Sequence, residues 1–197
     1  MPLTKLFVYD VKTAAAQRLE FDDTADSNPV WSPDGRYIAF SKRNNLKVDI
    51  YQKPADGSRD AELLYSSDEP KFVSAWSPDG RYLLMQQRTG SADNANNLGV
   101  WLLPVNGDHT PRPVLSGNTS YWDASISPNG RWIAYTSNQA SGIDVYVSSY
   151  PSLAGKWQVS FRGGEAAHWQ RDSKALYYLG SGRDIVKAEI TTDGAAF

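Results

Sequence analysis

The chain has 197 residues, enough for one large domain, and its 41% hydrophobic and 21% charged residues are close to globular averages, which excludes a disordered chain. Twenty Lys and Arg against 22 Asp and Glu give a net charge of −2, so the basic surface that nucleic acid or an anionic membrane requires is not expected. The chain has no cysteine, which excludes disulfides, thiolate catalysis and cysteine-ligated metal sites.

Strands and turns are the expected elements. Seven Trp and eleven Tyr stand mostly in short runs flanked by Gly, Pro, Asp and Asn, and no window has a helical stripe, so we predict an all-β fold. No apolar run approaches the roughly 18 residues of a membrane span, and residues 1–5 lack the apolar core of a signal peptide. Membrane insertion is therefore not expected. These features do not indicate in which cellular compartment the protein works.

After two predicted strands at 6–9 and 17–21, a six-residue phrase dominates the chain. Trp31-Ser-Pro-Asp-Gly-Arg36 recurs at 76–81, at 126–131 with Ile126 first and Asn129 fourth, and as a divergent copy at 169–174. The copies start 45, 50 and 43 residues apart, which is the period of a four-stranded propeller blade. Within the phrase, Pro presets the first corner of a tight turn, Asp bonds back to the backbone and Gly takes a left-handed corner. The Trp before the turn is expected to pack on the neighbouring blade.

Further strands are predicted between the copies of the phrase. Asp-Gly and Asn-Gly pairs between apolar runs indicate hairpins there. The predicted strands after the turns are 37–40, 82–85, 132–135 and 175–179, and the others are 48–52, 61–65, 98–103, 113–115, 143–147, 156–160, 165–169 and 185–190. In each blade they would run as strands A, B, C and D from the channel outward.

The segment Pro29–Phe40 resembles the TolB-like, WD-repeat-like β-propeller repeat, and the resemblance extends over essentially the whole chain. It implies one β-propeller over 1–197, with a half-blade at 5–22, blades at 26–66, 70–116 and 120–161, and an incomplete blade at 164–197. In such bacterial proteins the propeller usually binds a ligand or docks a partner, while another domain carries out catalysis. A protein like TolB would be periplasmic or extracytoplasmic.

With one inner strand before each of the first three turns as well, the predicted strands number 17, one more than the 16 that a closed ring of four blades needs. Three alternatives remain open. The N-terminal strand 17–21 could complete the last blade within one chain. Two chains could instead close a ring of about eight blades as a homodimer, which we favour because it removes every exposed strand edge. The chain could also be a fragment of a longer propeller.

The loops from D to A and from B to C share one face of a propeller, here called the channel face, and we expect a ligand there. The longest insertion, 88–97, lies on this face. The predicted ligand-binding residues are Asp26, Asn28, Asp68, Glu69, Lys71, Tyr121, Trp122, Asp123, Glu165 and His168. Carboxylates from several blades beside large aromatic rings could hold a cation, a peptide terminus or a sugar. The alternative is that these acids only cap turns.

A catalytic interpretation competes with the binding one. If the protein is an enzyme, Asp123 and Glu165 are the candidate pair for glycoside hydrolysis, because that reaction needs two carboxylates flanking the scissile bond. No Gly-x-Ser-x-Gly elbow or phosphate-binding glycine loop is present. The preferred prediction is a non-catalytic module that binds a protein, peptide or small ligand.

Metal and cofactor chemistry is not expected. Two histidines, His109 in a C–D loop and His168 on an inner strand, cannot supply a three-ligand zinc site without carboxylates. Oxygen-ligated calcium in the channel remains possible. On the opposite face, called the turn face, Arg36, Arg81, Arg131 and Lys174 recur after the turns. We expect each to pair locally, with an acidic partner as the alternative.

Overall fold

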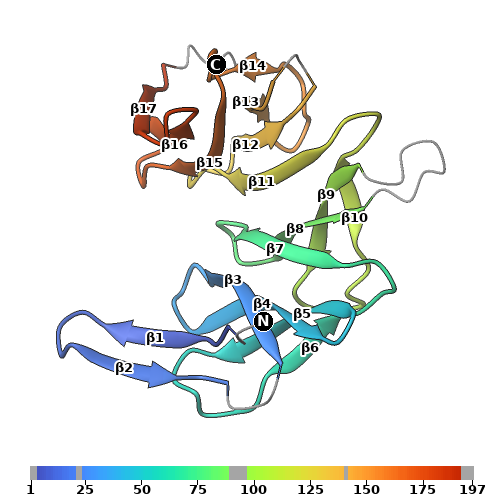
Figure 1. Ribbon diagram of the computed structural model, residues 1–197, viewed down its shortest axis with the longest axis vertical. Helices are drawn as coiled ribbons and strands as arrows, with labels where there is room; N and C mark the ends of the chain where they lie inside the picture. Colours follow the sequence, from blue (N-terminus) through green and yellow to red (C-terminus); the bar gives the residue numbers. More distant parts are fainter. Residues whose placement is uncertain (1–3, 21–23, 89–96, 140–141, 192–197) are drawn as a thin grey trace.

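The computed structural model describes residues 4–20, 24–88, 97–139 and 142–191, and every regular element in these ranges is a β-strand (Figure 1). The strands form antiparallel sheets that follow one another in chain order, three of them with four strands. The predicted all-β fold with four-stranded antiparallel blades is therefore confirmed. Among the described residues there is no helix that could cross a membrane.

Each sheet is built from strands that are consecutive in the sequence. The two-stranded first sheet pairs β1 (Phe7–Asp10) with β2 (Ala15–Arg18). The next sheet comprises β3 (Ala25–Trp31), β4 (Tyr37–Asn44), β5 (Lys47–Pro54) and β6 (Glu62–Tyr65). Then come β7 (Lys71–Trp76), β8 (Tyr82–Arg88), β9 (Leu98–Pro104) and β10 (Arg112–Leu115). The fourth sheet comprises β11 (Tyr121–Ile126), β12 (Trp132–Ser137), β13 (Asp144–Ser149) and β14 (Trp157–Gln158). The last sheet comprises β15 (Gly164–Trp169), β16 (Ala175–Gly180) and β17 (Ile185–Glu189).

The recurring phrase forms the turn between the first two strands of each of these blades. In the first copy the Ser32 hydroxyl donates to Asp34 at 2.7 Å and accepts the N–H of Tyr37 at 2.9 Å. Gly35 has a φ of 71°, which a residue with a side chain adopts only with strain. Ser77 and Ser127 make the same pair of bonds in the next two copies. The same sequence phrase therefore forms the same hydrogen-bonded turn in these three blades.

Two local expectations are corrected. The predicted strand 156–160 is reduced to Trp157–Gln158, because the Ser160 hydroxyl instead accepts the N–H of Val145 and donates to Asp144. The Trp before the turn packs between sheets at Trp76 and Trp169, but Trp31 is 52% exposed. The sheet before Trp31 has only β1 and β2, and these pack on Ile38 and Phe40 instead.

The hydrophobic core is divided into layers between neighbouring sheets. Phe40, Leu83, Ile133 and Leu176 are fully buried, each on the second strand of its own blade. Burying each such side chain contributes about 1.5–3 kcal/mol. The blades are therefore held together by face-to-face packing between neighbouring sheets.

Two buried ionic clusters also join the sheets. Lys71, whose side chain is fully buried, donates to Asp49 on the preceding blade at 2.7 Å. The Glu20 carboxylate, just after β2, accepts from Lys42 on β4 at 2.7 Å and from Lys53 on β5 at 2.8 Å. Such clusters make the contact between sheets specific, since a buried charge without its partner is costly.

The sheets form an open arc and not a closed ring. The innermost strands β3, β7, β11 and β15 lie side by side in that order, and the first and last sheets are at opposite ends of the molecule (Figure 1). In the described part of the chain β1 and β2 pair only with each other, and β17 has no further strand beside it. The alternative in which strand 17–21 completes the last blade of the same chain is therefore not what this structure shows.

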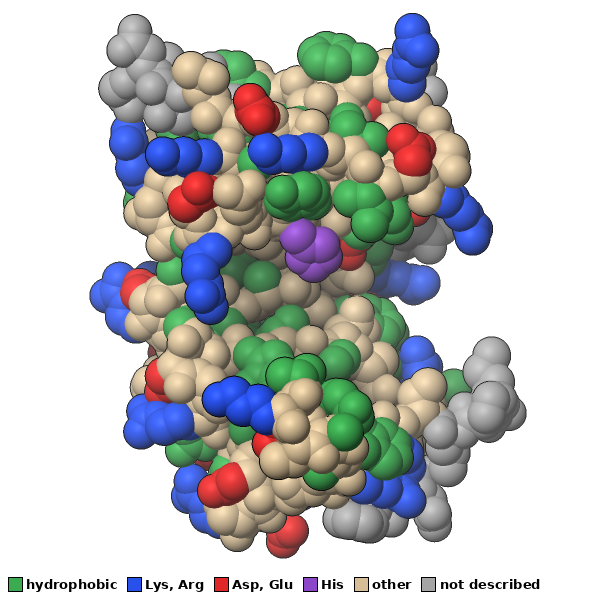
Figure 2. Space-filling model, turned by 90° about the vertical axis from the view of Figure 1, so that its left-hand side faces the viewer, with side chains coloured by type: hydrophobic (Ala, Val, Ile, Leu, Met, Phe, Trp, Pro, Cys, Tyr) green, Lys and Arg blue, Asp and Glu red, His purple; other side chains and the backbone are tan. Residues whose placement is uncertain are grey.

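One side of the molecule is shown in Figure 2. Hydrophobic side chains are visible in a recess between the upper and lower halves, and basic and acidic side chains are interspersed around it. No single sign of charge dominates this side.

Candidate functional site

The innermost strands share an irregularity that shapes the channel side of the fold. The pairing register shifts after Ser27 in β3, after Val73 in β7, after Trp122 in β11 and after Glu165 in β15. A bulge of this kind redirects side chains and is frequent beside functional sites. Three of the four bulges contain a residue with positive φ, namely Asn28, Asp123 and Ala166.

Asp123 lies in the bulge of β11 and has an unusual environment. Its side chain is half-buried, and its backbone N–H donates to the side-chain oxygen of Gln86, on the preceding blade, at 3.3 Å. Burial raises the pKa of the Asp123 carboxyl, the negative charge of Glu165 raises it further, and His168 acts in the opposite direction. The predicted residues Asp123, Glu165 and His168 thus form one electrostatically coupled group from two adjacent inner strands.

Glu165 also lines a cavity of about 550 Å³ beside this group. Ile143 and Leu179 form its apolar wall, and both are partly exposed. Arg183, in the turn after β16, lies at the same cavity and makes no ion pair within the described residues. The cavity therefore combines an anion, a cation and an apolar wall, a mixture suited to an amphipathic or zwitterionic ligand.

The described residues contain no group of three or more His, Asp or Glu side chains that could hold a metal ion. No set of calcium ligands is therefore found among the described residues, and calcium in the channel stays a prediction.

Other predicted ligand residues serve the packing of the blades. Lys71 is fully buried against Asp49, so it is not available to a ligand, contrary to the prediction. The Tyr121 ring packs edge-on against Tyr135 at 5.8 Å, between sheets. Both side chains turn toward the neighbouring blade, because the bulge and the pleat decide the direction of each residue.

The remaining predicted residues are dispersed. Asp26 is 3% exposed and Asn28 is exposed. Asp68, fully exposed, lies 3.4 Å from Lys47, while the backbone carbonyl of Glu69 accepts from Ser67. Trp122 is half-buried, with its backbone paired to Thr136. The predicted loop 88–97 lies outside the described residues except for its two ends.

On the turn face, the expected local pairing is found at Arg36 and at Arg81. Arg36 pairs with Asp34 and Arg81 with Asp79, each at 2.7 Å. The Arg131 guanidinium lies 5.7 Å from the ring centre of Trp132. His109 is half-buried, with its Nδ1 3.0 Å from the Pro104 carbonyl oxygen.

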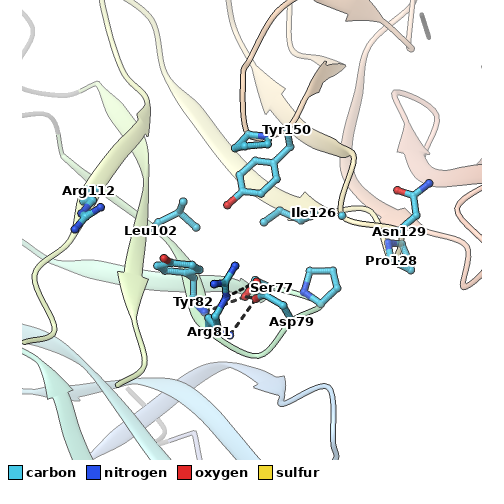
Figure 3. Close-up of a pocket in the computed structure, with 13 residues that line it drawn as sticks. Ser77, Asp79, Arg81, Tyr82, Leu102, Arg112, Ile126, Pro128, Asn129 and Tyr150 are labelled. Atoms are coloured by element: carbon cyan, nitrogen blue, oxygen red, sulfur yellow. Dashed lines mark hydrogen bonds and ion pairs between the residues drawn. The ribbon is translucent and has the colours of Figure 1, made fainter. Parts of the chain in front are cut away.

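The turn face also carries a cavity that the sequence interpretation missed. It measures about 600 Å³ and lies between the second and third four-stranded blades of the arc, counting from β3 (Figure 3). Its lining includes Tyr82, Arg112 and Tyr150, which come from three different strands or loops. The sequence feature that could have indicated this cavity is Ile126, because the other copies of the phrase have Trp at that position.

Comparison with known proteins places these features in a family. The family model described as the TolB beta propeller domain matches residues 3–150. No curated protein sequence matched the chain.

Solved structures with the same fold are similar at low identity. A putative TolB from Agrobacterium tumefaciens superposes with a TM-score of 0.72 at 16% identity, over 84% of this chain and 58% of that one. TolB from Acinetobacter baumannii gives 0.71 at 15% identity, over 95% and 49%. An oligogalacturonate lyase in complex with manganese gives 0.66 at 12% identity, over 90% and 54%. The chain thus spans about half the length of these structures, and the likeness concerns the fold.

Proposed function

The chain belongs to the TolB β-propeller family, and on that premise we propose that it is a binding module that takes a protein, peptide or small ligand on its channel face. The observation that carries the proposal is the coupled group Asp123, Glu165 and His168 next to an open cavity. Titratable groups perturbed by burial and by one another are typical of functional sites.

The chemistry of this group favours a ligand with hydrogen-bond donors or a positive charge. Glu165 is exposed at the cavity and offers an acceptor, and Arg183 offers a cation on the same wall. Burial is the first cause of the raised pKa of Asp123, and the charge of Glu165 is the second, so the two carboxyl groups act on each other at this site. A peptide carrying both charges would satisfy Glu165 and Arg183 together.

The test is a binding screen with matched variants. Peptide and glycan arrays should yield ligands whose affinity falls about tenfold or more in Glu165→Gln and in Asp123→Asn, since each loses an interaction that involves charge. Asp60→Asn changes an exposed carboxylate elsewhere and should bind as the parent does. Ligands whose binding is unaffected by both variants would contradict the proposal.

Glycoside hydrolysis is the second candidate, favoured by one observation. Asp123, whose pKa is raised, interacts with the charge of Glu165, and a carboxyl group with a raised pKa beside a second carboxylate is what a general acid in such a reaction requires. Turnover of a nitrophenyl glycoside panel that disappears in Asp123→Asn and in Glu165→Gln would establish catalysis. Absence of turnover over the whole panel rejects it and leaves the binding proposal unaffected.

Self-association is the third part of the proposal. Phe7, Tyr9 and Ile185 are 59–76% exposed and lie on the two end sheets of the arc. Burying them against a second copy would remove apolar surface and exposed edges together. We expect light scattering coupled to size exclusion to give twice the mass of one chain, stable on dilution. A single-chain mass at every concentration would contradict the homodimer.

A further inference from the structure

The turn face has two cavities at equivalent places in the repeat. One lies between the blades β3–β6 and β7–β10 and measures about 390 Å³; the other, between β7–β10 and β11–β14, measures about 600 Å³. The Ser-Pro-Asp-Gly turn, its Arg and the following Tyr contribute to both cavities. The smaller cavity is therefore an internal reference for the larger one.

The difference in size follows from one exchange at the start of the phrase. In the smaller cavity Trp76 occupies the space between blades, and its indole N–H donates to the Gly80 carbonyl at 3.1 Å. The equivalent residue in the larger cavity is Ile126, which is 6% exposed and packs with the core below. An isoleucine fills much less of the space between two sheets than an indole, so a cavity remains.

Further exchanges change the character of the wall. Leu102 stands where the smaller cavity has Gln52, and Tyr150 stands where it has Val105. The Tyr150 ring points into the space from one blade with Ile126 beside it, and Tyr82 and Leu102 line the space from the other blade (Figure 3). The wall of the larger cavity thus combines apolar side chains with two tyrosine rings and their hydroxyl groups.

The charges of the two cavities have opposite sign. The smaller one is lined by Asp34, Asp79 and Arg36, two negative groups and one positive. The larger one is lined by Asp79, Arg81 and Arg112, one negative group and two positive, because Asn129 replaces the second Asp and Arg112 has no counterpart in the lining of the smaller cavity. Arg81 is held by Asp79 at 2.7 Å, whereas among the described residues Arg112 makes no ion pair within 4.0 Å, and its charge acts on Asp108 only from a greater distance. The larger cavity therefore has an excess of positive charge.

We propose that this cavity is a binding site for a small organic anion, a carboxylate carried on an aromatic or aliphatic body. Arg112 holds the carboxylate, the Tyr82 and Tyr150 hydroxyls donate beside it, and the body lies on Leu102 and Ile126. The volume falls in the range of ordinary small-molecule sites. Bidentate pairing of guanidinium and carboxylate gives both affinity and orientation.

The test uses 1-naphthaleneacetate as the probe and its neutral amide as the control ligand, with saturation-transfer NMR and calorimetry. The carboxylate should bind with a dissociation constant below about 1 mM, and the amide about tenfold more weakly. Arg112→Gln, at an exposed position, should weaken binding of the carboxylate until its affinity equals that of the amide. Ile126→Trp, which installs the residue of the smaller cavity, should abolish binding of both.

Two controls separate this site from its neighbours. Arg36→Gln alters the smaller cavity, and Asp123→Asn alters the channel face, so both should bind the probe as the parent does. Saturable binding that is equal for carboxylate and amide, or that survives Arg112→Gln, overturns the proposal. So does the absence of probe binding at about 10 mM. None of these outcomes depends on whether Ile126→Trp folds.

Discussion

Replacing Lys71 with Met should lower the free energy of unfolding by about 3–5 kcal/mol, because it leaves the Asp49 carboxylate without its partner between two blades. The Lys71 ammonium has no exposed surface and donates to Asp49 at 2.7 Å and to the Ser67 carbonyl at 3.1 Å. It also lies 5.4 Å from the ring centre of Tyr65. Thermal unfolding should show a midpoint roughly 6–20 °C lower than that of the parent.

A matched control makes this result specific. Lys47→Met removes a lysine that lies 3.4 Å from the fully exposed Asp68, and its effect should stay within about 0.5 kcal/mol. The double variant Lys71→Met with Asp49→Leu should recover part of the loss, since no unpaired carboxylate remains. If Lys71→Met instead unfolds at the parent's temperature and loses a ligand, the binding role predicted from the sequence would be restored.

Lys71 also illustrates what the repeat can and cannot predict. Alignment on the Trp-Ser-Pro-Asp-Gly phrase placed this lysine in the loop from strand D to strand A, and in the structure it is the first residue of the inner strand β7. Its direction depends on Asp49, 22 residues earlier on another blade, and no local pattern contains that information. The turn itself was predictable in detail. Ser32, Asp34 and Gly35, which form it through a side-chain hydrogen bond and a left-handed backbone conformation, are only a few residues apart in the sequence.

The candidate sites show the same division between local and distant information. Asp123 and Glu165 were predicted to converge because both follow the loop from strand D to strand A, and the structure couples them. Tyr121 stands only two residues before Asp123, yet its ring packs between sheets. The register shift after Trp122 separates the two residues, and a bulge of this kind interrupts the alternation that sequence reasoning uses. The turn-face cavity needs Ile126, Leu102 and Tyr150 together, so the phrase alone could not reveal it.

The second large effect is expected at Glu20, which ties the first sheet to the blade after it. Its carboxylate accepts from Lys42 and Lys53, and all three side chains are at most 12% exposed. Glu20→Gln removes the anion and leaves two nearly buried cations close together, which should cost about 3–5 kcal/mol. Hydrogen exchange should accelerate first in β1 and β2, since they would then be held mainly by apolar contacts such as those of Leu6 and Leu19 with Ile38 and Phe40.

The same cluster gives the protein a defined sensitivity to acid. Burial by itself raises the pKa of Glu20, but the hydrogen bonds and charges of Lys42 and Lys53 outweigh it and hold the pKa below its ordinary value of 4.5. Because the folded state binds the proton less tightly than the unfolded chain, the cluster stabilises fully above about pH 4.5. The stabilisation is lost as the pH falls through the lower, folded-state pKa. Urea unfolding between pH 7 and pH 3 should therefore show a loss in the parent that is smaller in Glu20→Gln, while exposed Glu62→Gln follows the parent. Parallel pH profiles for parent and Glu20→Gln would mean that the carboxylate does not hold the first sheet in place.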